Sequence, residues 1–262
     1  MRFRPILSVV LTHTAQYLSF KEWIGILWYW MIGIVLYGLI GRSISSLTGN
    51  ETTGIFLIIT LIAIKPSVSR CAIEMPRAIL EQSAGHALVA TFATPITLSE
   101  WTIATMIMGL IGALIRWILG FVLLFLLFNI SVMTYLWQLI IISPLLLMAG
   151  WTIGIYLSVL TYIIGKKSDS FIRLIAESFI VLCGVFYPIA MLPQPFRFIA
   201  TQIPTTYIFE GLRAQITTGT SMWPYILTSM ELNLLYLGIG IFALFLTFKH
   251  VKNRGLASLE NK

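Results

Sequence analysis

The stretch WTIATMIMGLIGALIRWILGFVLLFLLF, residues Trp101–Phe128, decides the class of protein to which this chain belongs. It carries one charged side chain, Arg116, and is longer than the ~20 apolar residues needed to cross a hydrocarbon core ~30 Å thick. The whole chain of 262 residues is 58% hydrophobic and 10% charged, whereas soluble domains are about 25% charged. A soluble globular protein is therefore excluded, and the composition predicts an all-α integral membrane protein.

Further apolar runs lie on both sides of this stretch. Together they predict six transmembrane helices, at Trp23–Ile40, Thr53–Ile64, Trp101–Phe128, Leu136–Ile164, Phe171–Ile189 and Tyr225–Phe248. An even number of spans places both termini on the same side of the membrane. We expect one domain over residues 1–262, with residues 1–20 forming an uncleaved N-terminal interfacial helix.

The distribution of the cationic residues predicts on which side of the membrane the termini lie. Of 17 Lys and Arg residues, 13 fall at the termini and in the loops on one side of the predicted membrane, with only Arg42, Arg197 and Arg213 opposite and Arg116 inside a span. Cationic loops stay in the cytoplasm, so both termini are predicted to be cytoplasmic in a bacterial-type inner membrane. The same bias explains the net charge of +7 without a nucleic-acid partner.

Two stretches are unsuited to spanning. Residues 66–100 form a predicted cytoplasmic connection whose middle, Ala78–Thr91, is mildly amphipathic and typical of a helix on the membrane face. Residues 188–224 contain five prolines and yet remain apolar. Broken backbone at membrane depth is tolerated where protein or water covers it, so this segment predicts an external re-entrant helical hairpin.

The sequence Val185–Arg213, VFYPIAMLPQPFRFIATQIPTTYIFEGLR, resembles the permeases of ABC-2 type transporters. It has their aromatic-Pro pair, a following Leu-Pro and a Pro-x-x-Tyr-x-x-Glu-Gly-x-Arg ending. The stretch Ala93–Trp101, ATPITLSEW, is similar to the family's cytoplasmic element before the third span, although the preceding helix has fewer acidic residues than expected.

This resemblance implies an exporter in which two permease subunits, expected here as a homodimer, rest on separate ATPase subunits. Substrate would pass outward between the permeases by alternating access, and the resemblance leaves drug, lipid and glycan open as substrate classes. No phosphate-binding loop occurs in the chain, because the nearest stretch, Gly165-Lys166-Lys167-Ser168, lacks the required first glycine and final hydroxyl position. We therefore expect no enzyme activity and no cofactor in this chain, with ATP and Mg bound by the partner.

Three groups of candidate residues follow. The group expected to couple the permease to its ATPase is Glu74, Arg77, Glu81, His86, Thr94 and Pro95. The plainer alternative is an interfacial helix without a partner. The group expected to form an external gate is Tyr187, Pro188, Pro193, Pro204, Tyr207, Glu210 and Arg213. Glu210 and Arg213 lie three residues apart and can pair on one helical face or across subunits, and the alternative is a purely structural cap.

The third group contains possible pathway residues within the spans: Trp28, Trp30, Tyr37, Arg116 and Glu231. Aromatic residues there are more often lipid-interface anchors or packing residues, whereas ionisable residues inside a membrane are functional candidates by default. Glu177 follows Arg173 by four residues and is expected to bridge it. Gly150 and Gly154 form a GxxxG pattern, a weak signal of close helix approach.

Two other readings of the whole chain remain open. An ion-coupled secondary transporter would use Glu231, Glu177 and Arg116 as a relay, and inverted repeats, which would favour it, are not visible between the halves. A membrane enzyme acting on lipid by metal-diphosphate chemistry would need paired aspartates, and the chain has a single one, Asp169.

Overall fold

The computed structural model describes residues 10, 20–48, 66–84, 96–129, 133, 136–185 and 187–254, and all regular structure in these ranges is helical. In chain order the elements are α2 (Phe20–Thr48), η1 (Pro66–Arg70), α4 (Cys71–Ala84), α6 (Leu98–Phe128), α7 (Leu136–Ile164), η3 (Gly165–Ser168), α8 (Asp169–Leu182), η4 (Ile189–Met191), α9 (Gln194–Thr201), α10 (Pro204–Thr218) and α11 (Trp223–Arg254). The predicted second span and nearly all of the predicted interfacial helix lie outside the described residues.

Three of these helices, α6, α7 and α11, are long and apolar enough to cross a membrane. They fall on the predicted spans that begin at Trp101, Leu136 and Tyr225. The length and apolarity of these three helices support the expectation of a helical membrane protein. The six-span layout stays a prediction.

Local signals fix the ends of α6. Thr97 is its N-cap, where the Thr97 Oγ1 accepts from the Glu100 backbone N–H at 3.3 Å and the Glu100 carboxylate accepts from the Thr97 N–H at 3.0 Å. This reciprocal capping box satisfies two amides that the first helical turn leaves without partners. The helix ends at Asn129, whose φ of 56° is left-handed and stops further helical hydrogen bonding.

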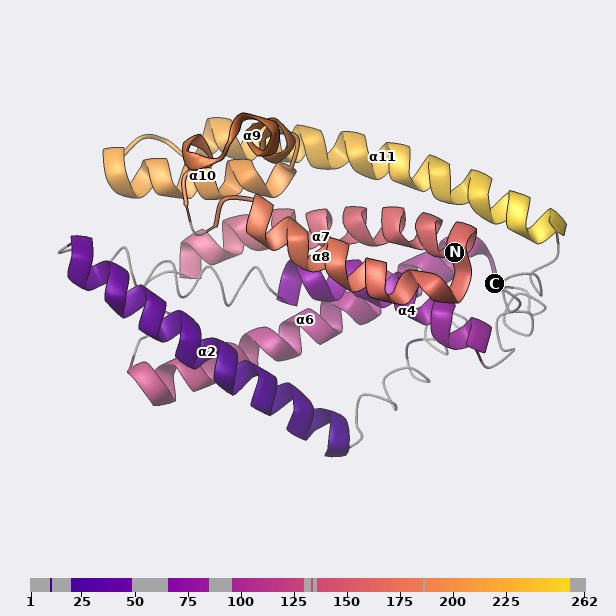
Figure 1. Cartoon of the computed structure of the whole chain (residues 1–262), viewed down its shortest axis with the longest axis horizontal. Helices are drawn as coiled ribbons and strands as arrows, with labels where there is room; N and C mark the ends of the chain where they lie inside the picture. The colour runs from indigo at the N-terminus through magenta and orange to yellow at the C-terminus, as the bar shows by residue number, and fades with distance from the viewer. Residues whose placement is uncertain are drawn as a thin grey trace.

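The helix α7 lies in the middle of the molecule and packs against α11 and α4, while α6 packs against α4 (Figure 1). Two apolar clusters hold these helices together. The cluster at the end where α9 and α10 lie includes Ile142, Leu146, Ile208, Phe209 and Ile226. The cluster at the opposite end includes Met75, Ile79, Trp101, Tyr162 and Phe248, with the Tyr162 and Phe248 rings edge to face and their centroids 5.9 Å apart. Apolar packing therefore holds both ends of α7.

The segment η1–α4 is more buried than a solvated connection would be. Residues 66–100 were predicted to form a cytoplasmic connection, and most of the described side chains of residues 67–83 are buried, with the segment packed against α6 and α7. Gly150 and Gly154 permit this close approach, because a Cβ at Gly154 would lie 2.8 Å from the Cys71 backbone oxygen. The weak GxxxG signal thus corresponds to a real helix crossing. Charges and prolines near Lys65 gave this segment the composition of a loop, although Arg70 and Glu74 neutralise one another inside the fold.

The predicted fifth span, Phe171–Ile189, is also shorter than expected. The helix α8 begins at Asp169 and ends at Leu182, and its 14 residues cover ~21 Å at 1.5 Å per residue. This length is less than the ~30 Å of a hydrocarbon core. A turn follows in which Gly184 has a φ of +70°, and the chain then enters the short helices η4, α9 and α10.

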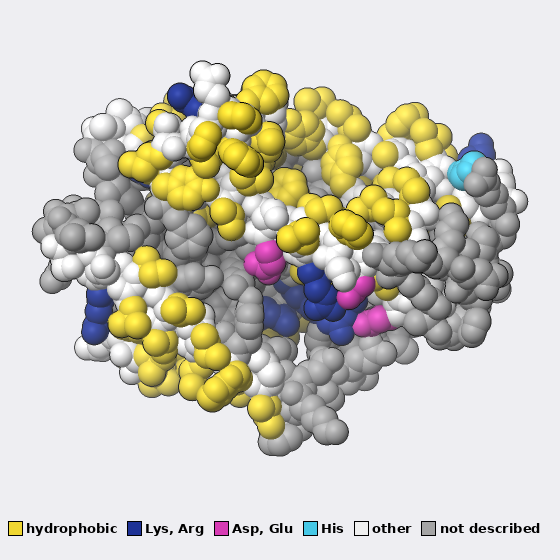
Figure 2. Space-filling model, viewed as in Figure 1, with side chains coloured by type: hydrophobic (Ala, Val, Ile, Leu, Met, Phe, Trp, Pro, Cys, Tyr) yellow, Lys and Arg dark blue, Asp and Glu magenta, His cyan; other side chains and the backbone are white. Residues whose placement is uncertain are grey.

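The outer faces of the molecule are apolar. Hydrophobic side chains cover α2 and the layer of α8, α9 and α11, while Lys, Arg, Asp and Glu side chains gather between these two areas (Figure 2). The helix α2 packs on α6, where the Arg42 guanidinium carbon lies 5.1 Å from the centre of the Phe128 ring. Large exposed apolar surfaces of this kind suit contact with lipid or with another membrane protein.

Candidate functional site

The predicted gate residues Glu210 and Arg213 form a polar clamp between α10 and the turn that follows α8. Arg213 Nη1 contacts Glu210 Oε1 at 2.5 Å, and Arg213 Nη2 donates to the Gly184 carbonyl at 2.7 Å. Glu210 Oε1 also accepts from the Ile189 backbone N–H at 3.1 Å. The expected pairing of Glu210 with Arg213 is confirmed within one subunit. These contacts tie α10 to residues 184–189, which are distant in sequence.

The turn at the clamp has the conformation that this contact needs. Gly184 adopts a left-handed φ that residues with a side chain rarely tolerate, and this φ accompanies the sharp turn after α8 whose carbonyl accepts from Arg213. Tyr187 reinforces the same turn, because its hydroxyl donates to the Val181 carbonyl at 2.6 Å. Both arms of the turn are thus fixed by hydrogen bonds from side chains.

The remaining predicted gate residues shape the short helices. Pro188 and Pro193 are the N-caps of η4 and α9, and Pro204 is the first residue of α10. Proline suits these positions because the first amides of a helix have no partner within it. Tyr207 donates from its hydroxyl to the Thr201 carbonyl at 2.9 Å and thereby fastens α10 to the end of α9. The predicted gate residues therefore lie around one hairpin, which we call the α9–α10 hairpin.

A cavity of about 340 Å³ lies beside the α9–α10 hairpin. Its walls come from α7, α8, the hairpin and α11, and include Ala149, Ile153, Phe179, Pro204 and Asn233. Its volume is near the lower limit of the 300–1,000 Å³ usual for small-molecule sites. The sequence analysis did not single out Asn233. Its place as the only Asn within the apolar part of the last predicted span, Tyr225–Phe248, is the signal that marks it.

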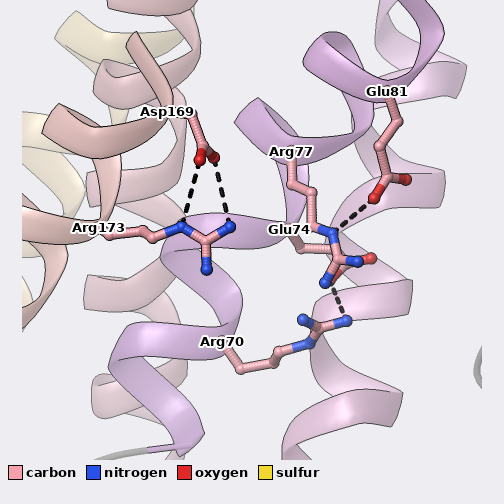
Figure 3. A network of polar contacts seen from close by, with 6 residues as sticks. All are labelled: Arg70, Glu74, Arg77, Glu81, Asp169 and Arg173. Atoms are coloured by element: carbon pink, nitrogen blue, oxygen red, sulfur yellow. Dashed lines mark hydrogen bonds and ion pairs between the residues drawn. The ribbon is translucent and has the colours of Figure 1, made fainter. Parts of the chain in front are cut away.

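At the opposite end of the fold, the candidate coupling residues of α4 form ion pairs along the helix (Figure 3). Arg70 pairs with Glu74 at 2.6 Å, and both side chains are at least nine-tenths buried. Arg77 pairs with Glu81 at 2.6 Å, and these side chains are 41% and 43% exposed. Glu74 therefore differs from its expected place on a docking surface, since it faces the interior, whereas Arg77 and Glu81 are accessible.

Arg173 on α8 corrects a smaller prediction. It was expected to bridge to Glu177, but it forms an ion pair with Asp169 one turn earlier, at 3.4 Å (Figure 3). Asp169 begins α8, where a negative charge complements the positive end of the helix dipole. The pair thus stabilises the start of α8.

The candidate pathway residues are spread over several helices. Arg116 on α6 donates from Nη1 to the Gly112 carbonyl at 2.9 Å, while Glu231 on α11 and Trp28 on α2 are exposed. The side chains of Trp30 and Tyr37 and the residues His86, Thr94 and Pro95 lie outside what the structure describes. No group of three His, Cys, Asp or Glu side chains within the described ranges is placed to hold a metal ion.

Comparison with known proteins adds no relative. No family model matches the chain, and no curated protein matches it significantly in sequence.

Proposed function

We propose that this chain is the membrane-spanning permease subunit of an ATP-driven exporter whose ATPase is a separate polypeptide. The observation that carries the proposal is the α9–α10 hairpin, which is clamped by Glu210 and Arg213 beside an apolar cavity at one end of three membrane-length helices. A short helical hairpin that closes one end of a membrane bundle suits a gate, because it can move without breaking a spanning helix.

In this proposal the chain keeps the predicted six spans, the fifth of which would be completed beyond α8 by the residues up to Ile189. Both termini lie in the cytoplasm of a bacterial-type cell, and two copies form the pathway. The α9–α10 hairpin faces outward. Substrate leaves by alternating access when the ATPase pair, which holds ATP and Mg, closes and moves the permeases. The proposal leaves drugs, lipids and glycans open as substrate classes.

The described residues with which α4 would meet the ATPase are Arg77 and Glu81. They form an exposed pair on α4, which lies away from the hairpin (Figure 1). The buried faces of α4 pack against α6 and α7, so that a displacement of Arg77 and Glu81 would be passed to these two helices. Rigid packed helices transmit such displacements because interiors are close-packed.

The test is affinity purification of the tagged full-length chain in mild detergent, followed by mass spectrometry. We expect a stoichiometric partner that carries a Walker A motif, and ATPase activity that changes when Glu81 is replaced by Lys. As the matched control, Glu177→Lys reverses an exposed glutamate on α8 and should leave the ATPase activity unchanged. A chain that purifies without any ATPase would contradict the proposal.

A second candidate function, ion-coupled secondary transport, is favoured by one observation. Glu231 is exposed on α11, a membrane-length helix, and a carboxylate facing lipid is costly unless it serves a pathway or meets a partner. Reconstituted vesicles separate the two candidates, because the exporter needs ATP and its partner, whereas the secondary transporter responds to a proton gradient alone and loses that response in Glu231→Gln.

A further inference from the structure

The cavity beside the α9–α10 hairpin has a wall of defined chemistry. Among the described residues that line it there is no Lys, Arg, Asp, Glu or His. Bringing an ionised group into such an apolar space without a counter-charge costs far more than a hydrogen bond returns. The cavity therefore favours a ligand without net charge, and its apolar walls of Ile153, Phe179 and Ile203 suit a hydrocarbon body.

Two hydroxyl groups of the wall have oxygen atoms left to accept hydrogen bonds. Tyr156 donates its hydroxyl proton to the Tyr236 carbonyl at 3.0 Å, and Thr152 donates its own to the Met148 carbonyl at 2.9 Å. Their donors are used within the protein, and their oxygen lone pairs remain able to accept. A ligand that satisfies these two oxygens must bring O–H or N–H donors, while the exposed amide of Gln202 also offers donors of its own.

Asn233 is a further acceptor that lacks a donor at this cavity. Its side chain is fully buried, and Nδ2 lies 3.5 Å from the Leu145 carbonyl, but within the described part of the chain Oδ1 has no hydrogen-bond partner. A buried acceptor left without a donor costs ~1–3 kcal/mol, and more where lipid replaces water around the fold. Asn233 borders the cavity, but its Oδ1 is closed off from it, so the side chain must rotate before a donor held there can remove this cost.

We propose that this cavity binds a neutral amphiphile, a molecule with a hydrocarbon body and a hydroxyl or amide N–H that donates to Asn233. The inference rests on the proposed function, since it names the substrate class of that exporter. A charged headgroup does not fit this site. The exposed side chains of Ile199 and Gln202 at the end of α9 would mark the mouth of the cavity, so that movement of the hairpin would admit or release the ligand.

The experiment is photolabelling of the purified full-length chain, without ATPase or nucleotide. Three probes share one long alkyl chain with a diazirine near the head and differ only in that head, which is an alcohol, its methyl ether or a phosphate. We expect adducts on the peptides that contain Ile153 and Phe179, displaced by unlabelled alcohol. The alcohol should label about fivefold more than the ether, the ratio that one net hydrogen bond supplies, and the phosphate least.

Two variants distinguish the effect of Asn233 from a general effect of substitution on α11. Asn233→Leu should abolish the preference for alcohol over ether, whereas Asn253→Leu, the same change at an exposed position on α11, should retain it. If Asn233→Leu does not fold, the comparison of alcohol with ether on the unaltered chain still tests whether the cavity prefers a ligand with a hydrogen-bond donor. Equal labelling by the alcohol and the ether would overturn the proposal, because it is the result expected if only water contacts Asn233. Labelling that unlabelled alcohol does not displace would overturn it as well. Since no ATPase is present, either result leaves the test of the exporter untouched.

Discussion

Replacement of Arg213 by Ala should open the turn that follows α8. The change removes the ion pair with Glu210 and the hydrogen bond to the Gly184 carbonyl. Hydrogen bonds to charged groups contribute ~1.5–3 kcal/mol each. The Arg213 and Glu210 side chains are about a quarter exposed, so solvent weakens the pair, and the lower part of that range applies. Because both contacts are made by one guanidinium, their contributions are not additive, and we expect the free energy of local opening to fall by about 2 kcal/mol.

Cys183 makes this opening measurable. It is a fully buried thiol that forms no disulfide, it is adjacent to Gly184, and the chain has one other cysteine, Cys71. In a Cys71→Ala background, N-ethylmaleimide reacts with Cys183 only when the turn opens. Since each 1.4 kcal/mol is tenfold in an equilibrium constant, a loss of about 2 kcal/mol raises the labelling rate roughly thirtyfold under native conditions. The rate is followed by the mass of the intact protein.

The matched control is Arg197→Ala, which removes an exposed arginine from the neighbouring helix α9. Its labelling rate should stay within about twofold of the parent, as is usual for a surface substitution. A labelling rate in Arg213→Ala equal to that of the parent would refute the clamp. An equal increase in both variants would show that loss of positive charge, rather than loss of the clamp, controls the turn.

Two further predictions concern the packing of α4. Gly154→Val should lower the free energy of unfolding by ~1–3 kcal/mol in thermal denaturation, because its side chain meets the backbone of the crossing helix, whereas Gly25→Ala, with open space around it, should not destabilise the fold. Glu74→Gln should destabilise by ~3–5 kcal/mol, as expected when one partner of a buried ion pair is removed. Glu81→Gln, in an exposed pair, should cost ~1 kcal/mol or less. Equal midpoints for the two glutamate variants would contradict the difference in burial.

Much of the fold was predictable from local sequence. The bounds of α7 agree with the predicted span Leu136–Ile164, and α6 extends the predicted Trp101–Phe128 by the three residues that complete its capping box. Long apolar runs are reliable because the requirement to avoid unpaired backbone groups in lipid acts on each helix separately. The prolines at the starts of η4, α9 and α10 were visible for a similar local reason.

Part of the candidate site was also predictable. The three-residue spacing of Glu210 and Arg213 indicated their pairing, because residues three apart share a helical face. Their contacts with Ile189 and Gly184 were not predictable, since these join residues 21 and 29 positions apart in the chain. Only the return of α10 onto the turn after α8 brings them together.

The amino-acid sequence by itself determined that the protein is helical with helices apolar and long enough for a membrane, where its longest helices run and where its backbone breaks, because hydropathy and helix capping act over a few residues. The tertiary structure decided which charges are buried and where space is left. Glu74 lies inside the fold because Gly150 and Gly154 let α4 approach α7, and Asn233 meets a cavity because α7, α8, α10 and α11 converge around it. Burial and cavities depend on contacts between distant segments, and no local pattern specifies those.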